Sequence, residues 1–389
     1  MSQSTPAGMP KSTSFSPELE ALRGWAILLV FLFHADGVIT GNDRIGTIVS
    51  PAMAFITAGH SGVTLFFVLS AFLLARTYLE EGRGGPIVNR RSFFRRRILR
   101  IMPLYTVAVV VAVALSGAQP TALVDGLRAL FFLNSFSGTV GSLVPYSAVW
   151  WSLATEVQFY LVLPILGLCL RSRRGQLFGL GLIVSWSIAY LVLAHNPALL
   201  STNARFQLSL SLFGRAPAFL AGITASWIAL RYGEGVRAAM KKAAWLRNGG
   251  SDALLLLVLF GLGLVLQQVT YRGFIRTELA APAAIFEESI LWTAVLLWVV
   301  LAPLRVHHLI TNRIFTTLGL LSYSIYLIHE PIIFFGGIRL LNLGYPLETD
   351  LLLRVGVFAL TFLLCVALSA VTYLAIERPF LVRKARLPR

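Results

Sequence analysis

Long apolar segments recur along almost the whole chain, and they constrain the fold more than any other feature. Each is long enough to cross the hydrocarbon core of a bilayer as a helix. Of the 389 residues, 57% are hydrophobic and 13% are charged, whereas soluble domains have about 25% charged residues. The apolar runs are continuous rather than alternating, which argues against a membrane β-barrel. We therefore predict an all-α, polytopic integral membrane protein with about ten transmembrane helices, near residues 22–40, 61–79, 101–117, 149–170, 177–195, 208–230, 252–270, 281–303, 315–338 and 351–376.

Basic residues are concentrated in alternate loops between these segments. The stretches 83–100, 171–174, 231–247 and 305–313 carry most of the arginines and lysines that precede the C-terminal tail. Basic loops are retained on the cytoplasmic side of a membrane. We therefore predict that both termini are cytoplasmic and that the chain is a multi-pass protein of the inner (plasma) membrane. The net charge of +16 is explained by this topology and by contact with the lipid bilayer, and it predicts no nucleic-acid partner.

The chain divides into one membrane domain with two short polar ends. Residues 1–17 are rich in serine and proline and predict a disordered cytoplasmic N-terminus. The membrane domain is expected at 18–380, with a basic cytoplasmic tail at 381–389 and a re-entrant segment at 127–132. Both cysteines lie in apolar segments, and no metal-ligand spacing is present, so no metal is predicted.

The first apolar segment contains two ionisable residues on one face. Arg23 and His34 are eleven residues apart, which places them on the same side of a helix and about 16 Å apart along its axis. Arg23 is then near the lipid headgroups, and His34 is deep in the hydrocarbon. An ionisable group at that depth must face protein or water, so His34 is a candidate functional residue. A structural histidine that bonds to a neighbouring helix is the alternative.

Arginine, without lysine, dominates the loop before the third segment. Seven arginines and no lysine lie between residues 83 and 100. A topology signal with contact to anionic lipids explains such a loop, but the fork-shaped guanidinium also suits bidentate phosphate binding. Arg97 and Arg100 are three residues apart on one helical face, so we predict that they contact the phosphates of a cytoplasmic ligand.

Polar residues lie at four further places within apolar segments. Glu156 lies about one turn inside the outer face of the membrane in the fourth segment, and it is either a proton-handling group or a buried structural carboxylate. Arg215 requires an ion-pair partner, for which Glu156, Glu287 and Glu288 are candidates. Ser70 is explained by a bond within its own helix. The ninth segment carries a polar stripe in which the residues are spaced by four and three positions, either lining a substrate path or joining helices: Ser322, Tyr326 and His329.

Six short motifs follow one another along the chain: Arg23-Gly24 with His34; Gly62-Val63 with 66–70; 93–97 with Arg100-Ile101 and Pro103; 151–153 with Glu156 and 158–160; 322–327 with His329 and Pro331; and Glu377 with Pro379-Phe380. In this order they resemble the integral-membrane acyltransferase-3 family of O-acyltransferases over about residues 18–380. Three positions depart from the family pattern, namely Thr64, Ala71 and Val157. The last of these leaves Glu156 as a single carboxylate at its motif.

The resemblance implies an acyl-CoA donor, most simply acetyl-CoA, and an acceptor hydroxyl on a glycan, a lipid-linked glycan or a macrolide-type molecule. O-acetylation of this kind belongs to carbohydrate modification at the cell envelope. The chain ends without the fused esterase-like domain of some members, which favours direct transfer to a small or lipid-linked acceptor, or a separate partner protein.

The resemblance also implies roles for the candidate residues. We expect Arg23, Arg97, Arg100 and Ser70 to bind the acyl-CoA, and His34 to act as general base or to carry the acyl group briefly. Glu156 is expected to orient or reprotonate His34, and His329 to bind the acceptor or stabilise the oxyanion. Acceptor contacts are expected from Tyr326, Ser322 and Trp151.

The competing hypothesis is a transporter or flippase for a lipid-linked or small molecule. Histidines at the middle of the membrane would then bind or relay protons. The arginine cluster beside the Arg23 and His34 pair favours the enzyme, because a proton-coupled carrier does not need it.

Overall fold

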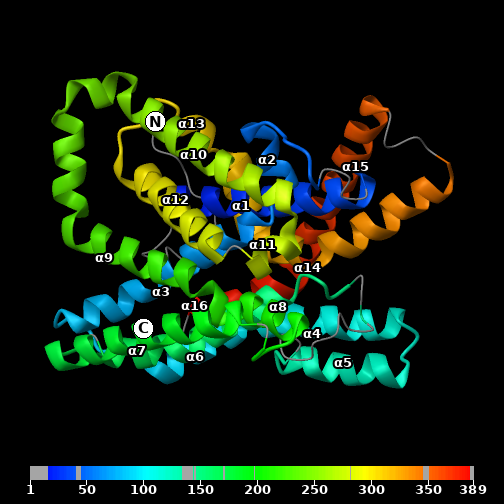
Figure 1. Ribbon diagram of the computed structural model, residues 1–389, viewed down its shortest axis with the longest axis horizontal. Helices are drawn as coiled ribbons and strands as arrows, with labels where there is room; N and C mark the ends of the chain where they lie inside the picture. The colour runs from blue at the N-terminus through cyan, green and yellow to red at the C-terminus, as the bar shows by residue number, and fades with distance from the viewer. Residues whose placement is uncertain are drawn as a thin grey trace.

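The computed structural model describes residues 16–40, 45–133, 143, 146–169, 171–196, 198–280, 282–344 and 350–385. Within these ranges the regular secondary structure is helical, without strands. Figure 1 shows most of the long helices running roughly side by side, with α4, α5, α6 and α7 in the lower half of the view and α1, α10, α12 and α14 in the upper half.

Ten long helices coincide with the ten predicted segments. They are α1 (Pro17–Thr40), α3 (Ser61–Gly82), α4 (Arg90–Leu115), α6 (Trp151–Cys169), α7 (Arg173–His195), α9 (Leu212–Lys242), α10 (Ser251–Arg272), α12 (Pro282–Leu301), α14 (Arg313–Asn342) and α15 (Leu351–Thr372). Nine segments of the described chain, which include all of these except α1, are long and apolar enough to cross a membrane. The prediction of an all-α, polytopic membrane protein is therefore confirmed. The side of the membrane on which each end lies stays a prediction.

Shorter helices connect the long ones. They are α2 (Pro51–Thr57), α5 (Pro120–Leu130), α8 (Thr202–Leu210), α11 (Phe274–Ala280), α13 (His307–Ile310), α16 (Arg378–Ala385) and the π-helical turns η2 (Leu246–Gly250) and η3 (Tyr373–Glu377). The segment expected to be re-entrant corresponds to the end of α5, which packs along α4 (Figure 1). The first part of the expected basic tail, residues 381–385, is the end of α16. Residues 1–15 and 386–389 lie outside the described residues.

Polar side chains define where several of the helices begin. The backbone N–H of Ser92 donates to Asn89 Oδ1 at 3.0 Å before α4. The N–H of Gly175 donates to Ser172 Oγ at 3.0 Å before α7, and that of Leu353 donates to Asp350 Oδ1 at 2.9 Å before α15. Each cap satisfies one of the backbone N–H groups that the first turn of a helix leaves unpaired.

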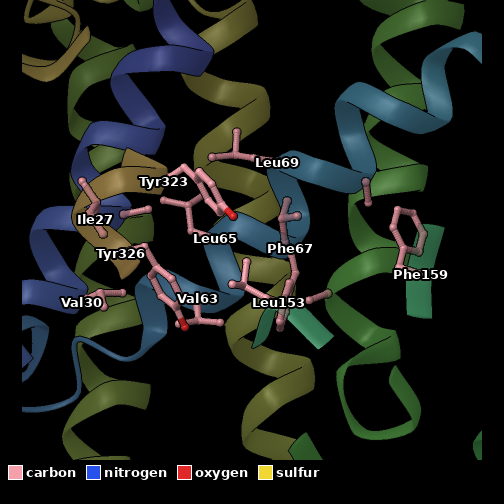
Figure 2. Close-up of a cluster of buried hydrophobic side chains, with 14 of the residues drawn as sticks. Ile27, Val30, Val63, Leu65, Phe67, Leu69, Leu153, Phe159, Tyr323 and Tyr326 are labelled. Carbon is pink, nitrogen blue, oxygen red and sulfur yellow. The ribbon is translucent and has the colours of Figure 1, made fainter. Parts of the chain in front are cut away.

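The centre of the bundle is the contact between α1 and α14. Their backbones approach closely at two glycines: a Cβ atom at Gly24 would lie 2.0 Å from the carbonyl oxygen of Phe315, and one at Gly319 would lie 1.9 Å from that of Glu20. Small residues allow such backbone contacts between membrane helices. Figure 2 shows how Ile27 and Val30 of α1 meet the tyrosines of α14 and the apolar side chains of α3 in the buried core.

Candidate active site

A cavity opens between α1, α3, α6 and α14, the helices that surround this core. Its apolar lining comes mainly from α3, and its polar lining comes from all four helices. The polar side chains that line it are Arg23, Ser70, Ser152, Glu156, Ser322, Tyr323 and Tyr326. Five of these residues were predicted as site residues from the sequence, and they come from four helices far apart in the chain. The fold therefore brings together Arg23, Ser70, Glu156, Ser322 and Tyr326 in one cavity.

Ser70 and Glu156 are paired across α3 and α6. The Ser70 hydroxyl donates a hydrogen bond to Glu156 Oε1, so the described bond of this serine is to another helix and not within its own. Tyr160, one turn after Glu156, interacts electrostatically with both Glu156 and Arg97, and the Arg97 guanidinium lies over its ring. A polar path thus runs from the arginine-rich start of α4 to the wall of the cavity.

His34 and His329 are in contact at the α1–α14 junction. His329 Nε2 lies 3.3 Å from His34 Nδ1, and the two ring centroids are 5.0 Å apart. His34 Nδ1 also lies 2.8 Å from the carbonyl oxygen of Val30. His329 Nδ1 lies 2.9 Å from the carbonyl oxygen of Tyr326. Carbonyl partners assign the proton to Nδ1 in both rings. His34 Nε2 then keeps a free lone pair, whereas the lone pair of His329 Nε2 faces His34 Nδ1.

Tyr326 joins the cavity to the histidine pair. Its hydroxyl lies 2.6 Å from both Ser152 Oγ and the carbonyl oxygen of Val149, at the start of α6. Its ring lines the cavity and lies 5.8 Å from the His329 ring, centroid to centroid. The polar stripe predicted on α14 therefore faces the interior: Ser322 and Tyr326 line the cavity, and His329 is completely buried behind them.

The arginines gather at the end of the cavity where α1 begins. Arg23 lines the cavity, and its buried Nε has no hydrogen-bond partner among the described residues. The Arg100 guanidinium lies 5.7 Å from the centroid of the Tyr323 ring, which also lines the cavity. Arg97 lies 5.7 Å from the centroid of the Tyr160 ring. Of the three predicted phosphate ligands, Arg23 lines the cavity, Arg100 contacts a tyrosine of its lining, and Arg97 lies outside the lining against Tyr160.

Glu377 of η3 belongs to this arginine end, although no separate role was predicted for it. Its carboxylate lies 3.3 Å from Arg100 Nη1 and accepts a hydrogen bond from Ser324. Arg100 is therefore partly neutralised by protein. Tyr323 and Tyr160 were missed as site residues for a different reason. They are aromatic residues in apolar segments, and only packing distinguishes them from other core side chains.

Two expectations about partners differ from the described contacts. The ion-pair partner of Arg215 is Glu278 of α11, with Nη2 and Oε1 2.7 Å apart, so the expected pairing with Glu156, Glu287 or Glu288 is wrong. The reason is that α11 is a short helix that the apolar pattern does not reveal. Trp151 does not line the cavity; its ring packs under the Arg215 guanidinium at 5.1 Å.

The contact expected between Glu156 and His34 has no counterpart among the described hydrogen bonds. Glu156 bonds to Ser70, and His34 faces His329. A role of Glu156 through His34 stays a prediction. Among the described residues, no group of three or more histidine, cysteine, aspartate or glutamate side chains is placed to hold a metal ion.

Comparison with known proteins gives one family and several distant relatives. The family model described as an acyltransferase domain matches residues 16–370. "Putative membrane-bound transacylase BcsY" of Komagataeibacter xylinus is 25% identical over 95% of this chain and 84% of its own length. "Acyltransferase MdmB" of Streptomyces mycarofaciens is 27% identical over 87% of this chain and 84% of its own. "Putative O-acetyltransferase SAS0844" of Staphylococcus aureus is 23% identical over 95% of this chain.

This chain spans 58% of the length of the staphylococcal relative. No solved structure matches the chain.

Proposed function

Because the chain belongs to the acyltransferase-3 family and is an O-acyltransferase, we propose that it transfers an acetyl group from cytoplasmic acyl-CoA to an acceptor hydroxyl within the inner (plasma) membrane. The acceptor is a glycan, a lipid-linked glycan or a macrolide-type molecule. Acetyl is favoured because a relative that aligns with 95% of this chain is named an O-acetyltransferase.

One observation carries the proposal. A single cavity has Arg23 and the Tyr323 ring beside Arg100 at one end, and Tyr326, which contacts His329, in its wall. Arg23 and His34 are about 16 Å apart along α1, comparable to the length of the pantetheine arm of CoA. Phosphates held among the arginines would then allow the thioester to reach the histidines. Arginine suits these phosphates because its planar fork forms two charge-assisted bonds at once.

His34 acts as the general base. Its Nδ1–H donates to the Val30 carbonyl, which leaves Nε2 free to accept the proton of the acceptor hydroxyl. The acceptor oxygen attacks the thioester carbonyl, a new C–O bond forms, the C–S bond breaks, and the thiolate takes the proton from His34. The acceptor ester and free CoA are the products, and the proton count balances.

The other predicted residues bind and orient. Tyr326 and Ser322 face the acceptor from the cavity wall, and His329 fixes the ring of His34 from the far side. Glu156 and Ser70 lie beside the path of the thioester and orient it through their shared hydrogen bond. Trp151 lies outside the cavity lining and packs against the Arg215 guanidinium.

The test uses inside-out membrane vesicles and acetyl-CoA labelled on the acetyl group. We expect release of CoA and label in a lipid, glycan or small-molecule fraction. His34→Ala is expected to lower the rate about 10²–10⁴-fold, the usual contribution of general base catalysis. The control is His308→Ala, which removes an exposed histidine of α13. Normal turnover in a folded His34→Ala protein contradicts the scheme.

The arginine site is tested separately. Arg100→Ala is expected to raise the apparent KM for acetyl-CoA about tenfold, since charge-assisted hydrogen bonds contribute about 1.5–3 kcal/mol each. Arg91→Ala removes an exposed arginine of the same helix as the matched control. If both substitutions changed the apparent KM for acetyl-CoA equally, the arginine loop would serve only to set the topology.

A further inference from the structure

A second group of buried polar residues lies away from the cavity, among α7, α9 and α11. Arg215 of α9 and Glu278 of α11 are each 4% exposed, and Tyr190 of α7 is 7% exposed. The helices α7, α8, α9 and α11 contact one another here, and Figure 1 shows α8 and α11 close together near the middle of the molecule. Neither the mechanism above nor the arginine end uses these three side chains.

The ion pair in this group is incomplete. Arg215 Nη2 donates to Glu278 Oε1 at 2.7 Å, but Arg215 Nε and Glu278 Oε2 have no hydrogen-bond partner among the described residues. The Tyr190 hydroxyl also lacks a partner and lies within electrostatic reach of both charged groups. A structural arginine–carboxylate pair would gain from two parallel hydrogen bonds. Each buried group left unpaired instead keeps the free-energy cost of having been removed from water.

The unpaired atoms have the hydrogen-bonding pattern that a hydroxyl satisfies. Arg215 Nε–H requires an acceptor, and Glu278 Oε2 requires a donor, and one hydroxyl supplies both. The Tyr190 hydroxyl can donate a hydrogen bond to a second hydroxyl of the same ligand, or accept one from it. Buried unpaired polar groups in a native protein call for such an explanation. The pattern fits a molecule with adjacent hydroxyls better than one with a single hydroxyl.

Intervening aromatic side chains connect this group to the histidine pair and to the cavity wall. His60, at the start of α3, interacts electrostatically with both Arg215 and His34, and the Phe33 ring contacts the rings of His34 and His60 at 5.0 Å each, centroid to centroid. Toward the cavity, the Trp151 ring packs against the Arg215 guanidinium. Its centroid lies 6.3 Å from that of the Phe67 ring in the cavity wall.

We propose that Arg215, Glu278 and Tyr190 form the acceptor subsite and bind adjacent hydroxyls of a polyhydroxylated acceptor, one sugar unit of which is presented to His34. This inference rests on the proposed function and adds to it the residues that select the acceptor. The subsite lies toward the His34 end of α1, away from the arginines at the Arg23 end.

The test compares two soluble probes on the protein in lipid nanodiscs. Methyl β-glucopyranoside carries adjacent hydroxyls, and tetrahydropyran-2-methanol has the same ring with a single hydroxyl. We expect the glucoside, and not the second probe, to raise the thermal midpoint of the wild type by about 2–4 °C at saturation. Glu278→Gln and Tyr190→Phe are expected to abolish the shift. Glu81→Gln, which alters a buried carboxylate paired with Arg171, is the control and should keep it.

Tyr190→Phe distinguishes loss of probe binding from a folding defect. Its hydroxyl has no partner in the structure, so removing it should leave the thermal midpoint without probe unchanged or higher. If Glu278→Gln does not fold, the glucoside-induced shift of the thermal midpoint in Tyr190→Phe alone tests the subsite. A glucoside shift that persists in Tyr190→Phe, an equal shift with both probes, or no shift in the wild type overturns the subsite and leaves buried water as the partner of these groups.

Turnover separates this inference from the proposed function. With methyl β-glucopyranoside as acceptor, Tyr190→Phe is expected to raise the KM for the glucoside about tenfold, with the KM for acetyl-CoA unchanged. If acetyl-CoA is turned over and the glucoside KM is unchanged in the variant, only the subsite fails. If no protein releases CoA from acetyl-CoA, the proposed function itself fails.

Discussion

Substituting alanine for Gly24 tests whether the close contact between α1 and α14 holds the two histidines in place. A Cβ atom at this position would lie 2.0 Å from the carbonyl oxygen of Phe315, whereas ordinary contacts are 3.4 Å or longer. The obstructing atom is backbone, so no side chain can rotate away. The helices must therefore separate by about 1.4 Å at this level to restore van der Waals contact.

That displacement is large compared with the geometry it would disturb. His34 and His329 belong to the same two helices, and their facing nitrogens are 3.3 Å apart. A misplacement of about 1 Å at a reacting group can reduce the rate about 10²-fold, and overpacking a core costs about 1–3 kcal/mol. We expect Gly24→Ala to lose between ten- and a hundredfold in turnover and to unfold at a clearly lower temperature.

The assay is labelled acetyl transfer together with thermal unfolding, followed by tryptophan fluorescence, in the same nanodiscs. Gly181→Ala and Gly235→Ala are matched controls, because both positions are helical and nothing lies within 4 Å of the added Cβ. Alanine is favoured over glycine in a helix by about 1 kcal/mol, so the controls should be neutral or slightly more stable. A Gly24→Ala protein with wild-type midpoint and turnover would refute the argument that this contact positions the histidines.

Three further outcomes follow from the described contacts, all measured by thermal unfolding in nanodiscs. Tyr326→Phe removes the partner of Ser152 and of the Val149 carbonyl; it should cost about 1–3 kcal/mol, and an unchanged midpoint would argue against those bonds. Glu377→Ala leaves Arg100 without its carboxylate and should cost about 3 kcal/mol; a stability equal to the wild type would mean that lipid or water replaces it. His307→Ala breaks a partly exposed pair with Glu18 and should change stability by no more than about 1 kcal/mol, so a large loss would contradict its peripheral role.

The long helices could be predicted because each one is specified by its own residues. An apolar run of sufficient length has few alternatives to crossing the membrane as a helix, and all ten runs became long helices. The short helices α2, α8, α11 and α13 were not predicted. Each is only four to nine residues long, and such elements depend on packing against neighbours rather than on their own composition.

The candidate site shows the same division. Arg23, Ser70, Glu156, Ser322 and Tyr326 stood out because polar residues are rare in apolar segments, and the fold gathers them in one cavity. Pairings between helices could not be predicted. Arg215 meets Glu278 rather than the glutamates of α6 or α12, and His34 faces His329 rather than Glu156. One sequence specifies which residues are unusual, whereas the packing of helices decides which of them meet.

The separation of Arg23 from His34 along α1 has an electrical consequence. In the proposed reaction the charged phosphates stay among the arginines, and only the uncharged pantetheine arm with its acetyl group extends deeper into the membrane. A membrane potential of 100 mV does about 2.3 kcal/mol of work on each elementary charge that crosses it, but it does no work on a neutral group. Catalysis on this scaffold would therefore proceed at the same rate in energised and de-energised cells, and the thioester alone would supply the driving force.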